Sequence, residues 1–256
     1  MLIDSHCHLD RIDLKPYQND FSCFMDEAKN NQIEHLLCIA IDLESYPAMI
    51  DLVNDYKQIS VTVGVHPNVQ ECIDPSVNDL IKLGQADKVI GIGETGLDYF
   101  RSEGNLEWQH NRFKNHIQAA KKLKKPLIIH TREAKEDTLR ILKEENAGEV
   151  GGVIHCFTED WEFAQKAMDL NFYISFSGIV TFKNASAIRE VAKKVPVDKF
   201  LIETDSPYLA PVPFRGRPNY PTYVRYVADQ VAELRGISSA KTAEISTKNF
   251  YDLFRL

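Results

Sequence analysis

Five of the eight histidines in this chain follow or end short apolar runs, where their side chains could gather at one site and four of them could ligate a metal ion. They are His6, His8, His66, His130 and His155, and two carboxylates, Glu94 and Asp205, follow other runs in the same way. Neutral imidazoles and carboxylates are costly to bury in one place unless a cation compensates. Mixed nitrogen and oxygen ligands suit Zn²⁺, Mn²⁺, Fe²⁺ or Co²⁺, and a carboxylate-rich half also suits Mg²⁺. The pattern predicts a divalent-metal site.

One residue separates His6 from His8. On an extended strand both side chains point the same way, because side chains alternate between the two faces. Both imidazoles can therefore reach a single ion. Cys7 points to the opposite face and is expected to pack rather than to ligate. By the same argument Cys156, which follows His155, is expected to face away from the site.

The elements that must position these residues are short strands alternating with helices. Eight apolar, β-branched runs have the length of buried strands: 2–4, 35–41, 59–65, 89–93, 127–130, 153–157, 172–176 and 200–203. Helical stripes separate most of them, and another stripe, with Val224, Val227 and Val231 on one face, follows the eighth run. The alternation predicts a doubly wound sheet or a (β/α)₈ barrel, in which the carboxyl ends of the strands converge on one mouth. The absence of repeats and linkers predicts a single domain over residues 1–256.

Composition excludes several classes of protein. The chain has 256 residues, 44% of them hydrophobic, and a net charge of −7, which excludes a disordered, fibrous or histone-like protein. Its five cysteines are scattered without a CxxC pair, which predicts neither a disulfide framework nor a zinc ribbon and favours a reducing compartment. No apolar run approaches the ~20 residues of a membrane helix, and no signal peptide is visible. We expect a cytoplasmic protein.

Five motifs, in order along nearly the whole chain, resemble the signatures of the TatD-type metal-dependent deoxyribonucleases. They are DSHCHLD at 4–10, GIGETGLDY at 91–99, IHTR at 129–132, IHCF at 154–157 and ETDSPY at 203–208, and RGRPNYP at 215–221 is similar to the loop that follows. A His-x-His unit alone is a weak signal. All five motifs together, in this order and spacing, are a specific signal. No predicted ligand position departs from the pattern of the family.

The resemblance implies a TIM-type (β/α)₈ barrel of the amidohydrolase kind with two divalent ions, Mg²⁺, Mn²⁺ or Zn²⁺. It implies hydrolysis of phosphodiester bonds in DNA, often from the 3′ end of single strands. The first ion would be held by His6, His8, Glu94 and Asp205, and the second by Glu94, His130 and His155, with Glu94 bridging. The fifth run ends in Ile128-Ile129-His130, with no lysine for the carboxylated bridge of many amidohydrolases, so a bridging glutamate is the consistent alternative.

Catalysis would rest on Glu94 and on Asp205, the latter as ligand and general base for the attacking water. Substrate contacts are predicted at four further positions. His66 would donate to a phosphate oxygen, Arg132 would offer a bidentate fork, Arg215 would hold a flanking phosphate, and Tyr208 would stack on a base.

Two alternatives stay open from the sequence. The same activated water could attack a carbonyl instead of phosphorus, in an amidohydrolase acting on an ester or amide such as aminoacyl-tRNA. A non-catalytic binding protein on the same barrel is expected to lose metal ligands, and all six predicted ligands are present here. The favoured prediction is a monomeric nuclease whose partner is single-stranded DNA or a 3′ end.

Overall fold

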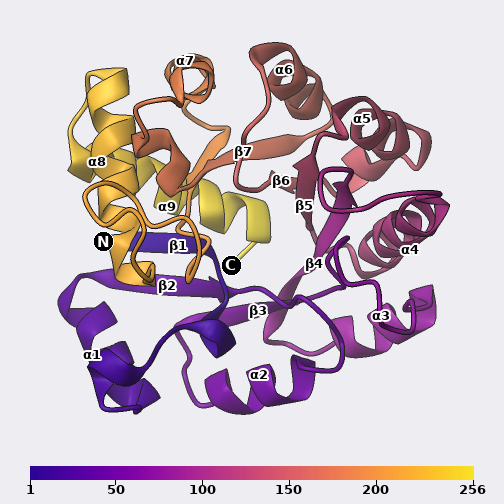
Figure 1. Ribbon diagram of the computed structural model, residues 1–256, viewed down its shortest axis with the longest axis horizontal. Helices are drawn as coiled ribbons and strands as arrows, with labels where there is room; N and C mark the ends of the chain where they lie inside the picture. The colour runs from indigo at the N-terminus through magenta and orange to yellow at the C-terminus, as the bar shows by residue number, and fades with distance from the viewer.

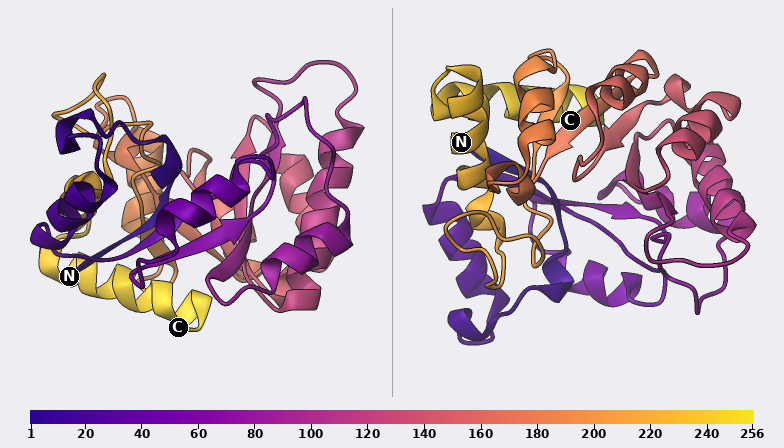
Figure 2. Two further views of the ribbon diagram at one scale, coloured as in Figure 1. Left: turned by 90° about the horizontal axis from the view of Figure 1, so that it is seen from below. Right: turned by 45° about the horizontal axis from the view of Figure 1, so that its top comes forward.

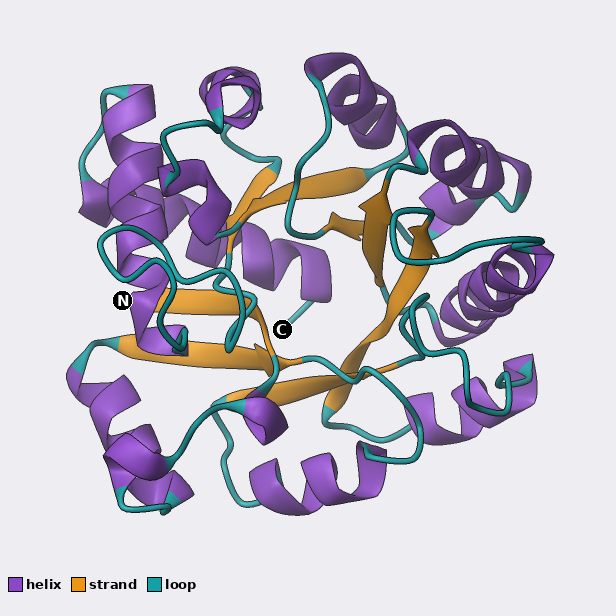
Figure 3. Ribbon diagram, viewed as in Figure 1, coloured by secondary structure: helices purple, strands orange, loops and turns teal.

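The computed structural model describes residues 1–256 and shows eight parallel strands in a ring surrounded by helices (Figures 1 and 3). The strands are β1 (Leu2–Cys7), β2 (Ile33–Cys38), β3 (Ile59–Val63), β4 (Val89–Asp98), β5 (Leu127–Arg132), β6 (Gly152–Ile154), β7 (Phe172–Phe176) and β8 (Phe200–Ile202). Each pairs in parallel with the next in sequence order. The (β/α)₈ prediction is therefore confirmed.

A helix follows each strand, and all but the last helix of the chain cover the outside of the ring. The helices are α1 (Phe21–Asn30), α2 (Tyr46–Val53), α3 (Val77–Gly84), α4 (Glu107–Leu123), α5 (Lys135–Glu144), α6 (Trp161–Asp169), α7 (Ser186–Lys194), α8 (Val224–Arg235) and α9 (Ser239–Phe254). The predicted stripe of valines lies on α8, where Val224, Val227 and Val231 are buried. The outer core between strands and helices is one cluster of 51 buried side chains, so most of the stabilising apolar burial lies there.

Helix α9 closes the barrel at the end opposite the long loops, as the left view of Figure 2 shows in yellow. Its Phe250 and Phe254 pack with Ile90, Ile128 and other inward side chains of the strands in a separate buried cluster. The amino ends of the strands are thus filled with apolar atoms. Only the opposite, carboxyl end is open to a ligand.

Strand β4 is longer than its apolar run predicts, and Glu94 lies within it rather than after it. The second half of β4 pairs with β5, from Thr95 opposite Ile129 to Asp98 opposite Arg132. Gly96 permits this pairing: it has a φ of +135°, and a Cβ there would come within 2.0 Å of a backbone oxygen of β5. The extension carries Glu94 and Asp98 into the mouth.

The seam between β1 and β8 is held near its carboxyl end. The buried carboxylate of Asp4 accepts hydrogen bonds from the backbone N–H of Thr204 at 2.9 Å and from its hydroxyl at 2.5 Å. The backbone N–H of Asp205 donates to the carbonyl of His6 at 2.9 Å. Residues about 200 positions apart in the chain are therefore neighbours in the mouth.

Candidate metal centre

The predicted ligands meet at the carboxyl end of the barrel. Five of them, His8, Glu94, His130, His155 and Asp205, line a cavity of about 910 Å³, and His6 is buried beside it. Each comes from the carboxyl half of a strand or from the residues just after it, where parallel strands converge. The structure brings all six together.

Glu94 lies at the centre of this group, and its two carboxylate oxygens face different histidines. Oε2 lies 3.3 Å from Nε2 of His6 and 3.9 Å from Nε2 of His8. Oε1 lies 2.8 Å from Nε2 of His155 and 3.2 Å from Nδ1 of His130. One carboxylate therefore links two sets of imidazoles that come from opposite sides of the barrel.

Asp205 completes the first set. Its Oδ1 lies 3.3 Å from Nε2 of His8 and 3.6 Å from Nε2 of His6. The backbone at Asp205 is left-handed, with a φ of +56°, and this turn directs the side chain toward β1. His6, His8 and Asp205 form one group of donor atoms close enough to share an ion.

Hydrogen bonds on the far side of three rings determine which nitrogen faces the centre. Nδ1 of His8 lies 3.0 Å from the carbonyl of Ile39, and Nε2 of His130 lies 3.0 Å from Oδ2 of Asp98. Nδ1 of His155 lies 3.3 Å from Oε1 of Glu203. Because oxygen acceptors take the N–H of each neutral ring, the other nitrogen keeps a lone pair for a metal ion.

His66 is arranged differently from these rings. Its Nδ1 accepts a hydrogen bond from the backbone N–H of Asn68 at 3.0 Å, so the neutral ring carries its hydrogen on Nε2. That Nε2 lies 3.2 Å from Oε1 of Glu94. His66 is therefore a hydrogen-bond donor to the centre, although its position beside Glu94 and His130 also fits a ligand group.

Side chains of α4 hold the loop that carries His66 through hydrogen bonds to its backbone. The buried guanidinium of Arg112 donates to the carbonyls of His66 and Val69 at 2.9 and 2.7 Å and pairs with Asp74. His116 accepts the backbone N–H of Val65 on Nε2 at 3.0 Å. Burial lowers the pKa of His116 to about 4, which keeps the ring neutral and able to accept this bond.

The electrostatics of the centre are those of a site that needs a cation. Burial alone would raise the pKa of Glu94, but His155, His66 and His6 hold it well below its usual range. Burial lowers the pKa of His155, yet the carboxylates of Glu94 and Glu203 outweigh this and raise it well above the ordinary value. Without a metal ion, protons on histidine must compensate the buried carboxylates.

The surroundings of the two ring nitrogens of His6 show whether a metal ion fits here. Both are buried, and neither has a hydrogen-bond partner. A buried imidazole without partners is unfavourable unless another group occupies its lone pair. Nε2 faces Glu94 and Asp205, so the free atom and its neighbours form a donor set of neutral nitrogen and carboxylate oxygen that fits a borderline divalent ion.

The rim of the cavity carries cations and one exposed aromatic ring. Arg101, Arg132 and Tyr208 line it, and Tyr208 is 49% exposed and lies edge-on to His8. The guanidinium of Arg132 lies 3.9 Å above the ring of Phe100, without a carboxylate partner. An unpaired guanidinium held flat on a ring is suited to an anionic ligand.

Arg215, predicted to hold a flanking phosphate, is not among the residues that line the cavity, and its guanidinium lies 4.4 Å from the ring centroid of Phe182. One expectation from the sequence needs correction. Cys156 lines the cavity rather than facing away, because its backbone is left-handed, with a φ of +44°, so simple strand alternation does not apply. Cys7, by contrast, is buried and its thiol donates to the carbonyl of Leu37, as strand alternation predicts.

Sequence reasoning gave no role to Asp98 or Glu203, the carboxylates that hold His130 and His155. A signal was present for Asp98, which is four residues after Glu94 on β4. Period-two alternation directs such residues to the same side of a strand. Glu203 follows the last residue of β8 and Asp205 has a left-handed backbone, so strand alternation gives no signal for Glu203.

A (β/α)₈ barrel with histidines and carboxylates converging at the open end is typical of metal-dependent hydrolases. Comparison with known proteins agrees with this class. The family model described as TatD related DNase matches residues 3–255. The chain therefore belongs to the TatD family and is a metal-dependent hydrolase.

Relatives in bacteria support this assignment. The chain is 46% identical over 256 residues to the uncharacterized metal-dependent hydrolase YcfH of Escherichia coli strain K12, covering 100% of this chain and 96% of the relative. It is 42% identical over 259 residues to the uncharacterized metal-dependent hydrolase YabD of Bacillus subtilis strain 168, covering 100% of both. The crystal structure of YjjV, a TatD homolog from E. coli K12, superposes with a TM-score of 0.91 at 28% identity over 100% of this chain and 98% of that one. No helix of this chain has the length and apolar character needed to cross a bilayer.

Proposed function

We propose that this metal-dependent hydrolase cleaves phosphodiester bonds of DNA from the 3′ end of single strands, using two divalent ions. The observation that carries the proposal is the arrangement of Glu94, whose two oxygens face separate histidine sets. His6, His8, Asp205 and Glu94 would hold the first ion, and Glu94, His130 and His155 the second. Bound Mg²⁺, Mn²⁺ or Zn²⁺ would supply Lewis-acid activation of water and neutralise charge on a phosphoryl group.

Asp205 is proposed as the general base. Burial alone would raise its pKa, but the hydrogen bond with His8 and the charge of His6 hold it below its usual range. The carboxylate is therefore ionised at neutral pH and can accept a proton from the attacking water. Its place on the rim, at the edge of the cavity, leaves it access to substrate.

His66 is proposed to donate from Nε2–H to a non-bridging phosphate oxygen. The hydrogen bond from Asn68 to its Nδ1 keeps the donor on the nitrogen that faces the centre. Neutralising the charge that develops on phosphate oxygens is a principal source of catalysis in phosphoryl transfer.

The rim supports a phosphodiester as the substrate. Arg101 and Arg132 line the cavity without carboxylate partners, whereas the neighbouring Arg11 is paired with Asp42 at 3.3 Å. In a chain with a net charge of −7, two unpaired cations at the mouth give a local attraction for phosphate. Tyr208 offers an exposed ring on which a base can stack.

The experiment that tests this function is a time course on single-stranded DNA labelled at the 3′ or the 5′ end. Bound metal ions are first removed from the protein with a chelator, and Mg²⁺, Mn²⁺ or Zn²⁺ is then added back separately. We expect metal-dependent release of mononucleotides from the 3′ end, absent in Asp205→Asn and retained in Asp51→Asn, which changes an exposed aspartate on α2. Intact DNA under every metal would overturn the nuclease proposal, and release of amino acid from aminoacyl-tRNA would then identify a deacylase.

Replacing Arg132 with Ala is expected to raise KM for DNA about 10-fold with a smaller change in kcat, because a charge-assisted contact to phosphate contributes about 1.5–3 kcal/mol. Arg132→Lys keeps the charge but loses the guanidinium that lies over Phe100. Its KM should therefore lie between those of the wild type and Arg132→Ala. Steady-state kinetics on single strands measure both. An unchanged KM in Arg132→Ala would remove this residue from the substrate site.

A further inference from the structure

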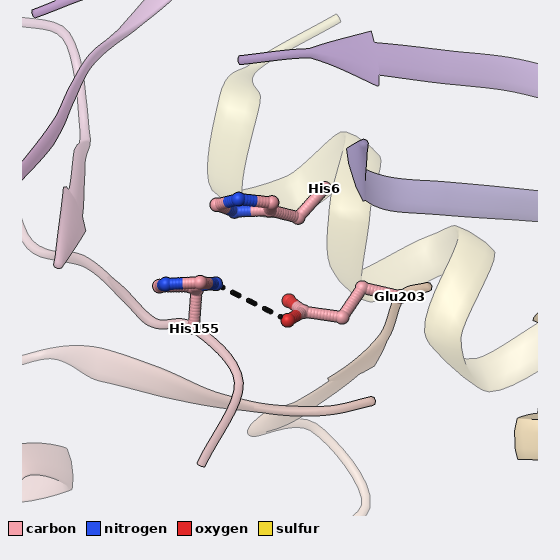
Figure 4. A group of neighbouring side chains, drawn as sticks. All are labelled: His6, His155 and Glu203. Carbon is pink, nitrogen blue, oxygen red and sulfur yellow. Dashed lines mark hydrogen bonds and ion pairs between the residues drawn. The ribbon is translucent and has the colours of Figure 1, made fainter. Parts of the chain in front are cut away.

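Glu203 lies next to two of the proposed ligands, beside His155 and on the side of the His6 ring that faces His155, as Figure 4 shows. Its side chain is fully buried and does not line the cavity. Oε1 accepts the backbone N–H of Cys156 at 2.8 Å and lies 3.3 Å from Nδ1 of His155. One side of this carboxylate is thus occupied by the segment that follows β6.

The other oxygen of Glu203, Oε2, is buried and has no hydrogen-bond partner. His6, whose ring nitrogens also lack partners, has a donor atom within 4.8 Å of those of His155 and Glu203. The rings of His6 and His155 stack in parallel, with centroids 3.9 Å apart and an interplanar angle of 10°. One carboxylate therefore lies within reach of two stacked imidazoles, one from each proposed ion position.

The contacts of Glu203 favour positioning over ligation. Its Oε1 lies against Nδ1 of His155, whereas Nε2 of that ring faces Glu94 at 2.8 Å. An ion bound through Nδ1 would break the contact with Glu203 and lie outside the cavity. Nε2 of His6 likewise faces Glu94, which leaves Nδ1 as the nitrogen free to turn toward Glu203.

We propose that Glu203 is a positioning residue shared by both ion positions, accepting Nδ1–H of His155 on Oε1 and Nδ1–H of His6 on Oε2. It thereby keeps Nε2 of both rings available to the two ions. This inference rests on the two-ion site of the proposed function. Carboxylates that hold metal-binding histidines in this way raise ion affinity about 10- to 100-fold, and here one carboxylate would act on both positions.

The test measures the stepwise binding of Zn²⁺ to the metal-free protein. Each affinity is obtained by competition with a chromophoric chelator. Glu203→Ala should weaken both binding steps about 10- to 100-fold. Asp98→Ala removes a carboxylate whose contact among the proposed ligands is with His130, so it should weaken one step. His8→Ala and His130→Ala identify which step belongs to which position. Glu162→Gln, an exposed residue of α6 paired with Lys166, should leave both steps unchanged.

Glu203→Gln separates the two contacts. The one oxygen of the glutamine amide accepts from Cys156 N–H and from His155 Nδ1–H, so the amide nitrogen faces His6. That nitrogen is a donor, and it disfavours the tautomer of His6 that carries its hydrogen on Nδ1. We expect the first position to weaken and the second to keep its affinity. The melting temperature of each metal-free variant and the visible spectrum of its Co²⁺ form distinguish altered ligation from a damaged fold.

Wild-type affinities in Glu203→Ala would overturn the proposal, and so would a loss confined to one step, as in Asp98→Ala. If Glu203→Ala does not fold, Glu203→Gln decides: unchanged affinity at both positions refutes the shared role. A wild-type protein that binds fewer than two ions would contradict the two-ion function itself. That outcome is visible before any variant of Glu203 is made.

Discussion

Replacing Glu94 with Gln is expected to reduce kcat for DNA hydrolysis by at least about 10³-fold, a loss of about 4 kcal/mol of transition-state stabilisation. The reason is geometric. The oxygens of Glu94 face both histidine sets across the centre, with Oε2 toward His6 and Oε1 toward His155. Gln keeps the shape but removes the charge and one of the two ligand oxygens. Both proposed ion positions should lose affinity together.

The barrel itself should survive this substitution, because Gln fills the same volume in β4 and its amide can bond the surrounding imidazoles. Turnover on single-stranded DNA, measured beside the melting temperature, separates the two effects. Glu136→Gln, on the exposed first turn of α5, is the control for loss of one negative charge. Full hydrolysis by Glu94→Gln under saturating Mg²⁺ would show that Glu94 does not bridge.

Removing divalent ions is expected to lower the melting temperature of the wild-type protein by roughly 10 °C. An ion at 1,000 times its Kd stabilises the folded state by about 4 kcal/mol, and each kcal/mol shifts the melting point of a protein near this size by about 2–4 °C. The physical source is the group of buried carboxylates and imidazoles around Glu94, including the unpartnered ring of His6. Calorimetry with EDTA and with added Mn²⁺ or Zn²⁺ measures the shift.

His8→Ala provides the matched control for this stabilisation. It removes one ligand of the first position while its neighbours remain. Its metal-free form should melt near the metal-free wild type, but added ions should raise its melting point less. A wild-type melting point that does not respond to saturating Mn²⁺ or Zn²⁺ would contradict the metal centre.

The eight strands could be predicted because buried parallel strands are apolar on both faces. Phe172–Phe176, for example, was predicted with the bounds it has in β7. Strand ends were less accurate, since pairing with a neighbour decides where a strand stops. Glu94 and Asp98 belong to β4 only because Gly96 lets that strand approach β5 at His130.

Loop residues were the least predictable part of the site. The guanidinium of Arg215 lies over the ring of Phe182, and Cys156 was expected to face away from the site but lines the cavity. Both outcomes depend on backbone turns and on contacts between loops, which no period in the sequence encodes. Helix α9 likewise closes the amino end of the barrel because apolar side chains of the strands converge there.

By itself, the sequence determined the class of this protein: the alternation of strands and helices, and the histidines and carboxylates at the strand ends. Residue types and local spacing carry that information. Only the tertiary structure decided which nitrogen of each ring faces the centre, because the acceptors come from other strands. Glu203 is 48 positions from His155, and Asp98 is 32 from His130. Hydrogen bonds over such separations exist only once the barrel has closed.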